Sequence, residues 1–427
     1  MGSNRPPRSQ RGAAALGVTM LLLFVLALVV AMAHRNLLFE QRSSANQLRS
    51  TRAFEAAEAG LEWAQALLNR AGAIGADCES DSAEPGETSL RDRMLAWDAA
   101  SGRFAPRTYG GPGGPLPLQA ACVADDDGWR CSCPTSGPAT LDVPGGAAAH
   151  PAFSIRFVAA PRAGMVQIVA TGCDDVGAAC SATASGAPAG DAAARVQATL
   201  ALLPALASSP SAALTVRGDI ASNGALTLVN QDATTQGLTA RAGGAITAPA
   251  ANLLTLPGHS GADSLAARDG DLGAGDAERL LARVLGVDAA RWQQLAGVHR
   301  LACGADCASA IAEAAAPDRG ASMFWIEGDL AIEGPATLGS TERPLLLVVD
   351  GELRLQGAVT IHGVVVSRAP AWDTSGTSGA EIHGALVALG DLRGDGTPTI
   401  VRDAAVLARL HGGLGHFARV AGSWRDF

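Results

Sequence analysis

The stretch R-G-A-A-A-L-G-V-T-M-L-L-L-F-V-L-A-L-V-V-A-M-A-H-R, residues 11–35, decides the fold of this chain. No residue between Ala13 and Ala33 is charged. As a helix that rises about 1.5 Å per residue, this segment is roughly 31 Å long, which matches the hydrocarbon core of a bilayer. Arginines at positions 5, 8 and 11 precede it without any acidic residue. The positive-inside bias therefore predicts a cytoplasmic N-terminus and places the rest of the chain across the membrane.

A second helical pattern follows the apolar segment. Residues 53–68 read A-F-E-A-A-E-A-G-L-E-W-A-Q-A-L-L and contain no proline. Apolar side chains recur there at the spacing of one helix face, so that face needs a sheet or another helix to cover it. We therefore expect one transmembrane and amphipathic helix over residues 13–70, half of it in a membrane or a filament core and half packed on a folded domain.

Three interpretations of this N-terminus are open. A secretory signal peptide would be cleaved after Ala33, because Ala31-Met32-Ala33 fits the small-x-small rule, although its apolar region is longer than usual. An uncleaved signal anchor needs only the apolar segment. A prepilin leader, residues 1–12, would be cleaved on the cytoplasmic side and would leave the whole helix in the mature chain.

Two motifs favour the prepilin interpretation. The run Q-R-G-A-A-A-L at residues 10–16 and the box A-A-E-A-G-L-E-W-A at residues 56–64 resemble the N-terminus of PilX-type minor pilins, the assembly proteins of type IV pili. The resemblance implies that a prepilin peptidase cleaves after Gly12 and methylates Ala13. It also implies that residues of the filament-core helix and of the pilin helix motif take part in assembly, namely Leu16, Gly17, Phe24, Phe54, Glu55, Glu58 and Leu61.

Gly17 departs from the pattern of the major pilins, which have a glutamate at this fifth position of the mature chain. PilX-like proteins and the type II secretion pseudopilin GspK also tend to lack this glutamate. The departure therefore favours a minor component that starts assembly over a bulk filament subunit.

Composition excludes several classes of function. The net charge is −9 and the chain contains no lysine, which argues against nucleic-acid binding and removes both a P-loop lysine and a Schiff-base nucleophile. The chain also lacks an H-E-x-x-H, a G-x-S-x-G or a Walker motif. We therefore expect a protein that is not an enzyme and binds no cofactor or metal.

Residues 71–205 have the pattern of an antiparallel sheet. Runs of β-forming residues at 153–159, 165–171 and 195–203 are separated by turn signals. A long helix laid across such a sheet is an α+β fold, and the resemblance implies that it is a pilin-like head. We expect an irregular β-solenoid-like domain to follow it.

Eight cysteines lie beyond the apolar segment, which fits an oxidising compartment where disulfides persist. Short local loops favour the pairs Cys173 with Cys180 and Cys303 with Cys307. Cys131 and Cys133 are too close to prefer each other, so we expect them to reach Cys78 and Cys122 in an order that the sequence leaves open. Zinc ligation is the alternative, but C-x-C and C-x-x-x-C do not make a double C-x-x-C motif.

One pattern repeats in residues 206–427. The motif G-[DE]-[LI]-x-x-x-G-x-x-T-[LI] begins at Gly218, Gly328, Gly351 and Gly390. A single copy cannot bury its apolar face unless another stacks on it, so we expect coils of an irregular β-solenoid. An antiparallel meander of hairpins is the alternative, because the spacing of the copies is not strictly periodic.

A helical insertion interrupts these repeats at about residues 276–316. Segments 276–285, 288–295 and 308–316 have helical periodicity, and Asp276 and Asp288 stand in N-cap positions. These helices are expected to cover an end or a face of the stack, because an exposed end is an unpaired strand edge.

Three groups of residues have alternative chemical interpretations. His362 and His383 recur in I-H-G echoes between the repeats, and adjacent coils would place them side by side as a structural ladder or as two metal ligands. Residues 125–127 are three aspartates, typical of a solvated loop and suited to calcium only with further oxygen ligands. The acids of the repeats, Asp329, Glu352 and Asp391, fall at a turn position, so paired carboxylates of a polysaccharide hydrolase are not indicated.

The resemblance implies a minor pilin that primes type IV pilus assembly, lies at or near the pilus tip and supports twitching motility and adhesion. Its implied partners are the prepilin peptidase, other minor pilins, the major pilin, the inner-membrane assembly platform and a pilus-tip adhesin. Its implied location is the inner membrane, as a single-pass protein with a periplasmic C-terminus, and then the pilus on the cell surface. The alternatives are a GspK-like minor pseudopilin of a type II secretion system and a membrane-anchored adhesive protein.

We predict that the mature protein begins at N-methylated Ala13, because cleavage after Gly12 retains the whole apolar helix. Intact-mass measurement and N-terminal sequencing of the purified protein check this expectation. A chain that begins at His34 would instead identify a secretory signal peptide.

Overall fold

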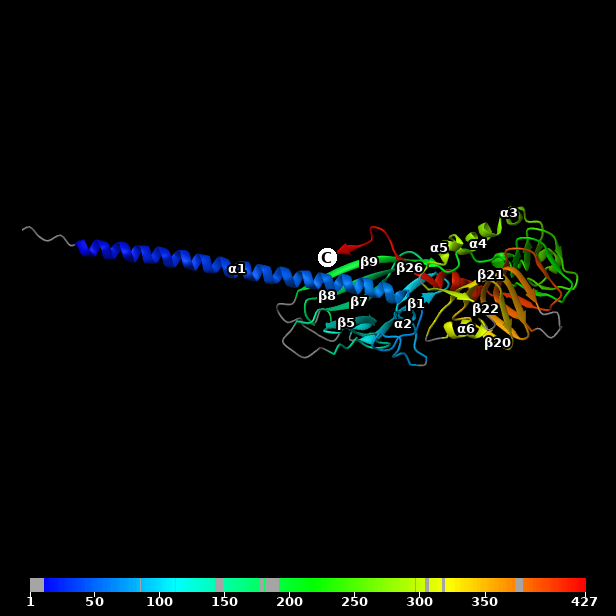
Figure 1. Ribbon diagram of the computed structural model, residues 1–427, viewed down its shortest axis with the longest axis horizontal. Coiled ribbons are helices and arrows are strands. Elements are labelled where there is room, and N and C mark those ends of the chain that lie inside the picture. The colour runs from blue at the N-terminus through cyan, green and yellow to red at the C-terminus, as the bar shows by residue number, and fades with distance from the viewer. Residues whose placement is uncertain are drawn as a thin grey trace, which may run out of the picture.

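The computed structural model describes residues 11–84, 86–111, 113–142, 149–176, 180, 192–295, 297–303, 307–316, 319–372 and 379–427. Most of the predicted leader, residues 1–12, lies outside the described residues. A single long helix projects from an elongated body (Figure 1). We call the half of the body that packs on this helix the proximal domain, residues 69–204 and 415–427. The half farther from the helix is the distal domain, residues 205–414.

The helix α1 spans Arg11–Leu68, 58 residues, as one uninterrupted element. The side chains of residues 15–52 are exposed, and burial begins at Ala53. The predicted continuous helix is therefore confirmed, with its end two residues earlier than expected. By length and composition, α1 is also apolar enough to cross a membrane.

The proximal domain is built on an antiparallel sheet with the strand order β26-β9-β8-β7-β5-β6, in which β27 also pairs with β9. The three strand segments predicted from the sequence are β7, β8 and β9. The elements of this domain are α2 (Leu90–Met94), β1 (Leu95–Asp98), β2 (Arg103–Pro106), β3 (Thr108–Gly111), β4 (Gly114–Pro117), β5 (Gln119–Asp125), β6 (Gly128–Ser132), β7 (Ala152–Ala159), β8 (Met165–Cys173), β9 (Ala193–Pro204), β26 (Gly415–Arg419) and β27 (Arg425–Asp426).

The C-terminal half of α1 lies very close to this sheet, because the residues at the contact are small. A Cβ atom at Gly172 of β8 would overlap the helix backbone at Ala53 and Ala57. A Cβ atom at Gly60 would lie 2.8 Å from the ring of Phe153. The alanines and glycine of the box at residues 56–64 therefore allow the helix backbone to approach the strands, and Leu61 fills the core beside them at 0% exposure.

The distal domain is an insertion into the proximal sheet. The chain leaves this sheet at the end of β9 and returns to it as β26, with Gly415 paired to Pro204. Residues 415–427, expected as the end of the repeat domain, thus form edge strands of the proximal sheet. The physical reason is that β9 has an open edge beyond β8, and Phe417 of β26 completes the proximal core at 0% exposure.

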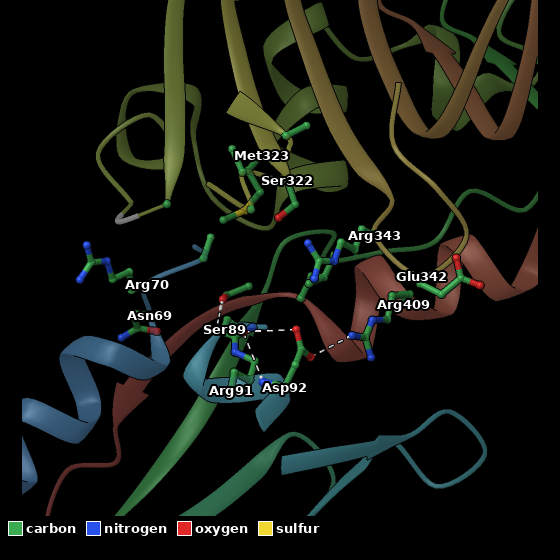
Figure 2. A pocket seen from close by; sticks show the side chains of 17 residues that line it. Asn69, Arg70, Ser89, Arg91, Asp92, Ser322, Met323, Glu342, Arg343 and Arg409 are labelled. Carbon is green, nitrogen blue, oxygen red and sulfur yellow. Dashed lines mark hydrogen bonds and ion pairs between the residues drawn. The ribbon is translucent and has the colours of Figure 1, made fainter. Parts of the chain in front are cut away.

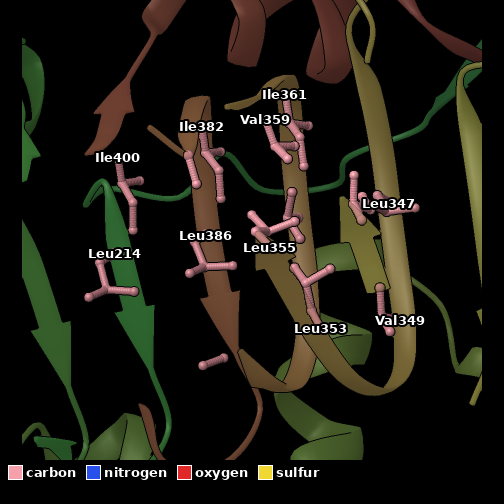
Figure 3. Packing of buried hydrophobic residues seen from close by; sticks show 14 of the residues in the cluster. Leu214, Leu347, Val349, Leu353, Leu355, Val359, Ile361, Ile382, Leu386 and Ile400 are labelled. Carbon is pink, nitrogen blue, oxygen red and sulfur yellow. The ribbon is translucent and has the colours of Figure 1, made fainter. Parts of the chain in front are cut away.

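The described strands of the distal domain pair in parallel, so the antiparallel meander is wrong. The strands are β10 (Leu214–Val216), β11 (Ile220–Ser222), β12 (Thr227–Val229), β13 (Ala240–Ala242), β14 (Ile246–Thr247), β15 (Asn252–Leu254), β16 (Leu265–Ala266), β17 (Val298–Ala302), β18 (Met323–Glu327), β19 (Leu330–Glu333), β20 (Ala336–Leu338), β21 (Leu345–Gln356), β22 (Val359–Trp372), β23 (Glu381–Ala388), β24 (Leu392–Gly394) and β25 (Thr399–Arg402). Their inward leucines, isoleucines and valines form one core (Figure 3).

The layers of the distal domain do not stack in sequence order. The first layer, β10 to β12, lies between the last layer, β23 to β25, and the layer β13 to β15. Leu214 pairs with Leu386, Ile220 with Leu392 and Leu228 with Ile400. The backbone N–H of Asp219 donates to the Oδ1 atom of Asp391 across the same separation of 172 residues. The chain therefore starts inside the stack at β10 and first adds β13 on one side of it. It fills the other side last, when β23 pairs with β10.

Helices cover one face and one end of this stack. The described helices of the distal domain are η1 (Ala233–Thr235), η2 (Gly261–Ser264), α3 (Gly270–Gly273), α4 (Ala277–Leu285), α5 (Ala289–Trp292), α6 (Cys307–Ala314), α7 (Ala404–Ala408) and η3 (Arg409–Gly413). Asp276 and Asp288 cap α4 and α5, as predicted. Trp292 of α5 packs on Trp325 of β18 on the outer face. Ile311 of α6 enters the inner core, so α6 closes an end.

The glycine and acid of the repeat motif form a ladder at one corner of the stack. Asp329 Oδ1 accepts a hydrogen bond of 2.7 Å from the backbone N–H of Glu352, 23 residues later. Asp219 Oδ1 accepts in the same way from Ala245, at 2.7 Å. A Cβ atom at Gly351 would overlap the carboxylate of Asp329 and would lie 2.6 Å from the backbone of Gly328. The glycine thus leaves room for the carboxylate of the neighbouring layer.

The hydrogen bond from the backbone N–H of Asp219 lowers the pKa of Asp391, and the hydrogen bond from Arg393 lowers it further. A carboxyl group with a lowered pKa contributes stability while it is ionised. This contribution is therefore present at neutral pH and is lost as the pH falls below 3.8, the ordinary value, toward the lowered pKa.

We predict that Gly351→Ala lowers the free energy of unfolding by about 1–3 kcal/mol, because the new Cβ displaces the Asp329 carboxylate. Thermal unfolding followed by circular dichroism checks this. Gly110→Ala is the matched control, since a Cβ atom there meets nothing within 4 Å. Equal melting temperatures for the two variants would contradict the steric role of Gly351.

Candidate functional site

The exposed part of α1 is the largest apolar surface of the described chain. Leu16 is 65% exposed and Phe24 is 68% exposed, and the side chains of residues 15–52 are all exposed. A Cβ atom at Gly17 would meet nothing within 4 Å. Exposed apolar surface of this extent marks a membrane or a protein interaction site. Gly12 and Ala13 lie in the first turn of the same helix.

The helix motif at residues 54–61 joins α1 to the C-terminal segment. The ring of Phe54 meets that of Trp424 edge-on, with centroids 6.3 Å apart. The indole Nε1 of Trp424 donates to Glu58 Oε1 at 2.6 Å. Leu61 is buried in the proximal core, whereas Glu55 is exposed. Glu58 therefore positions the end of the chain, while Glu55 faces outward and is available to a neighbour.

Two polar side chains hold the C-terminal end of α1. Asn69 bonds in both directions to the backbone of Phe417, donating to its carbonyl at 2.9 Å and accepting from its N–H at 2.6 Å. Arg91 Nη2 donates to the carbonyl of Leu68 at 2.9 Å and to that of Gly415 at 2.8 Å. The last carbonyls of a helix lack partners within the helix and carry partial negative charge, so the arginine both pairs with and neutralises this end.

The surroundings of Arg91 disfavour the charged form of its guanidinium. Burial is the main cause that lowers the pKa of its guanidinium to about 10; Asp92 opposes this effect, and the positive charge of Arg409 adds to it. Arg91 also lies over the ring of Phe417, 4.8 Å from its centroid. These contacts join α1, α2 and β26 at one residue that no sequence motif had singled out. Its only signal was the placement of an arginine in a short segment between apolar residues.

Four disulfides connect the described cysteines: Cys78–Cys133, Cys122–Cys131, Cys173–Cys180 and Cys303–Cys307. The first three lie in the proximal domain. Arg93 packs beside the first, where its Nη1 donates to the carbonyls of Cys133 at 2.6 Å and Gly75 at 3.0 Å. The fourth ties the end of β17 to the start of the α6 cap.

Among the described residues, the side chains considered as alternative metal ligands do not come together as a metal site. The rings of His362 and His383 stack with centroids 5.0 Å apart, and His383 Nε2 lies 3.2 Å from Glu381. Within the described residues, no group of three or more His, Cys, Asp or Glu side chains could hold a metal ion. Asp125 accepts backbone N–H groups of Asp127 and Gly128 at 3.0 Å each, so it closes the β5–β6 turn instead of facing an ion.

The geometry defines a class of protein in which an exposed apolar helix is joined through its second half to a folded body. Residues 11–62 match the family model described as PilX N-terminal. The N-terminal segment of the chain is therefore similar to that of PilX-type proteins. This match spans the filament-core helix and the helix motif predicted from the sequence.

Two further comparisons add little. No curated protein sequence matches the chain. The competence-associated pilin ComZ from Thermus thermophilus, a solved structure, aligns with 89% of this chain and 97% of that chain at 12% identity and a TM-score of 0.22. A TM-score this low does not establish a shared fold.

We predict that Arg91→Met lowers the free energy of unfolding by about 2–4 kcal/mol, because the carbonyls of Leu68 and Gly415 lose a charged donor. Chemical denaturation of the full chain in detergent measures the change. Arg300→Met is the control, since Arg300 is exposed and pairs with Glu327 at the surface, a contact worth about 1 kcal/mol or less. A loss no larger than that of the control would show that Arg91 does not hold the helix end.

Proposed function

We propose that this chain is a minor pilin that primes type IV pilus assembly. One observation carries the proposal: an uninterrupted helix whose first part is apolar and exposed is joined by buried contacts to a large folded body. Such a helix has two suitable environments, the lipid bilayer and a bundle of like helices. We propose that this helix moves from the bilayer into a bundle of like helices, as the helix of a filament subunit does.

Gly17 supports a role in starting the filament. A glycine inside an exposed helix costs about 0.5–1 kcal/mol relative to alanine, and the described fold gives no packing reason for it. The reason then lies outside the chain, in the neighbouring helices of an assembly. Because the glutamate of the major pilins is missing here, we propose that this subunit begins a filament and does not extend it.

The position of the distal domain favours the tip of the filament. This domain lies at the end of the body opposite the free end of α1 (Figure 1). We interpret its parallel layers as a solenoid-like stack whose bulk would collide with a subunit placed directly above it in a regular filament. Its first layer, the layer β13 to β15 and β16 leave an apolar pocket of about 360 Å³, lined by Ile220, Leu253 and Leu265 among others, which is a suitable contact for another tip component.

We predict that a strain producing Gly12→Val retains the uncleaved precursor in the membrane and lacks surface pili, because the prepilin peptidase requires the glycine. Immunoblots of membrane fractions and electron microscopy of cells check this. Gly17→Ala is the matched control and should be processed normally. Normal pili together with a defect in type II secretion would favour the pseudopilin alternative.

The tip position has its own test. Gold-labelled antibodies against the distal domain should bind sheared pili at one end only. Labelling spaced along the shaft would contradict the tip assignment while leaving the role in assembly intact.

A further inference from the structure

A cavity lies where the two domains meet. It has a volume of about 60 Å³ (Figure 2). One wall comes from the residues that follow α1 and from α2, and the other comes from the distal domain. The lining residues that carry charge are Arg70, Arg91, Asp92, Glu342, Arg343 and Arg409. Since a single water needs about 10–15 Å³ by this measure, the space holds several waters or one small polyatomic ion.

The charge around this cavity is not balanced. Four of its lining residues are arginines and two are carboxylates. Arg70 and Glu342 point away from the space in Figure 2, and Arg70 bonds to Ser80. Arg91, Arg343 and Arg409 then face Asp92 alone. An excess of positive charge in a partly enclosed space is costly unless an anion offsets it.

The donors around the space are incompletely used. Arg409 Nη2 lies 3.2 Å from Asp92 Oδ1, its guanidinium lies over the ring of Trp97, 5.5 Å from the centroid, and its Nε is buried without a hydrogen-bond partner. Arg343 projects from the distal domain above Asp92 in Figure 2, and its guanidinium makes no ion pair with any described residue. Arg91 differs, because its donors are taken by backbone carbonyls. Of these three arginines, Arg343 is thus the one whose guanidinium donors are without an ion-pair partner among the described residues.

Arg91 lies beside the same space. Burial is the main cause of its lowered pKa, and the negative charge of Asp92 raises that pKa more than the positive charge of Arg409 lowers it. An anion between Arg343 and Arg409 would lie near all three guanidinium groups. It would supply the negative charge that the fold itself leaves out.

We propose that this cavity binds a small tetrahedral oxyanion, of the chemical class of inorganic phosphate, held by the guanidinium groups of Arg343 and Arg409. The planar fork of an arginine matches two oxygens of such an ion and forms short, charge-assisted hydrogen bonds. Ser322 also lines the space, whereas the hydroxyl group of Ser89 already donates to Asp92 Oδ2 at 3.2 Å. The bound ion bridges the domains, because Arg343 belongs to the loop before β21 and Arg409 follows α7, beside Asp92 of α2.

The test uses the full chain in detergent, titrated with sodium phosphate by isothermal calorimetry, with sodium chloride at matched ionic strength as the reference. Phosphate should bind one site per chain and raise the melting temperature by about 2–4 °C beyond the chloride reference. No heat and no shift beyond chloride would overturn the proposal.

Substitutions identify the site. Arg343→Gln should weaken phosphate binding about tenfold or more, because one charged donor is lost, and Arg343→Lys should weaken it less, because the charge remains without the fork. Arg354→Gln is the matched control, since Arg354 is exposed and pairs with Glu352 on the distal domain. Circular dichroism establishes that each variant is folded. Phosphate affinity in Arg343→Gln equal to that of the unsubstituted protein would place the ion elsewhere and overturn the assignment.

Discussion

The antiparallel pairing of β9 with β26 is the constraint on which the rest of this structure depends. It brings the two ends of the distal domain together at Pro204 and Gly415, so that a whole domain is attached at two neighbouring points. The backbone N–H of Ala205 bonds to the carbonyl of Leu414 just beyond them, at 3.0 Å. Through Asn69 and Arg91, the same strand β26 also holds the end of α1. The membrane-type helix, the proximal sheet and the distal layers therefore meet at one strand.

The parts of this fold that local sequence determines could be predicted. An uncharged run followed by a proline-free amphipathic pattern specifies a helix by itself, and the ends of α1 lie within two residues of the expected ones. Asp276 and Asp288 cap helices because an aspartate side chain pairs with N–H groups only three residues away. The repeated motif predicted stacking, because one copy cannot bury its apolar face alone, and the structure adds that Asp391 and Asp329 accept hydrogen bonds from neighbouring layers.

What could not be predicted depends on contacts between distant residues. The pairing of the layer at Leu214 with the layer at Leu386 uses short apolar strands that would fit several neighbours equally well, so the repeats do not encode their order. The return of Phe417 to the proximal core is hidden for a similar reason, because a single aromatic residue in a short final segment carries no periodicity. Arg91 escaped notice because its partners are backbone carbonyls, which have no sequence signature.

The return of the C-terminal segment to the proximal sheet also sets an order of events. The partners of Asn69 and Glu58 on this segment, Phe417 and Trp424, follow the distal domain in the sequence. The proximal sheet therefore stays open at the edge of β9 until the segment beyond the distal domain is in place. A chain that is cut short anywhere in the distal domain exposes that edge and leaves α1 without its support. Folding of the proximal domain thus ends with a closing step that truncated chains cannot complete.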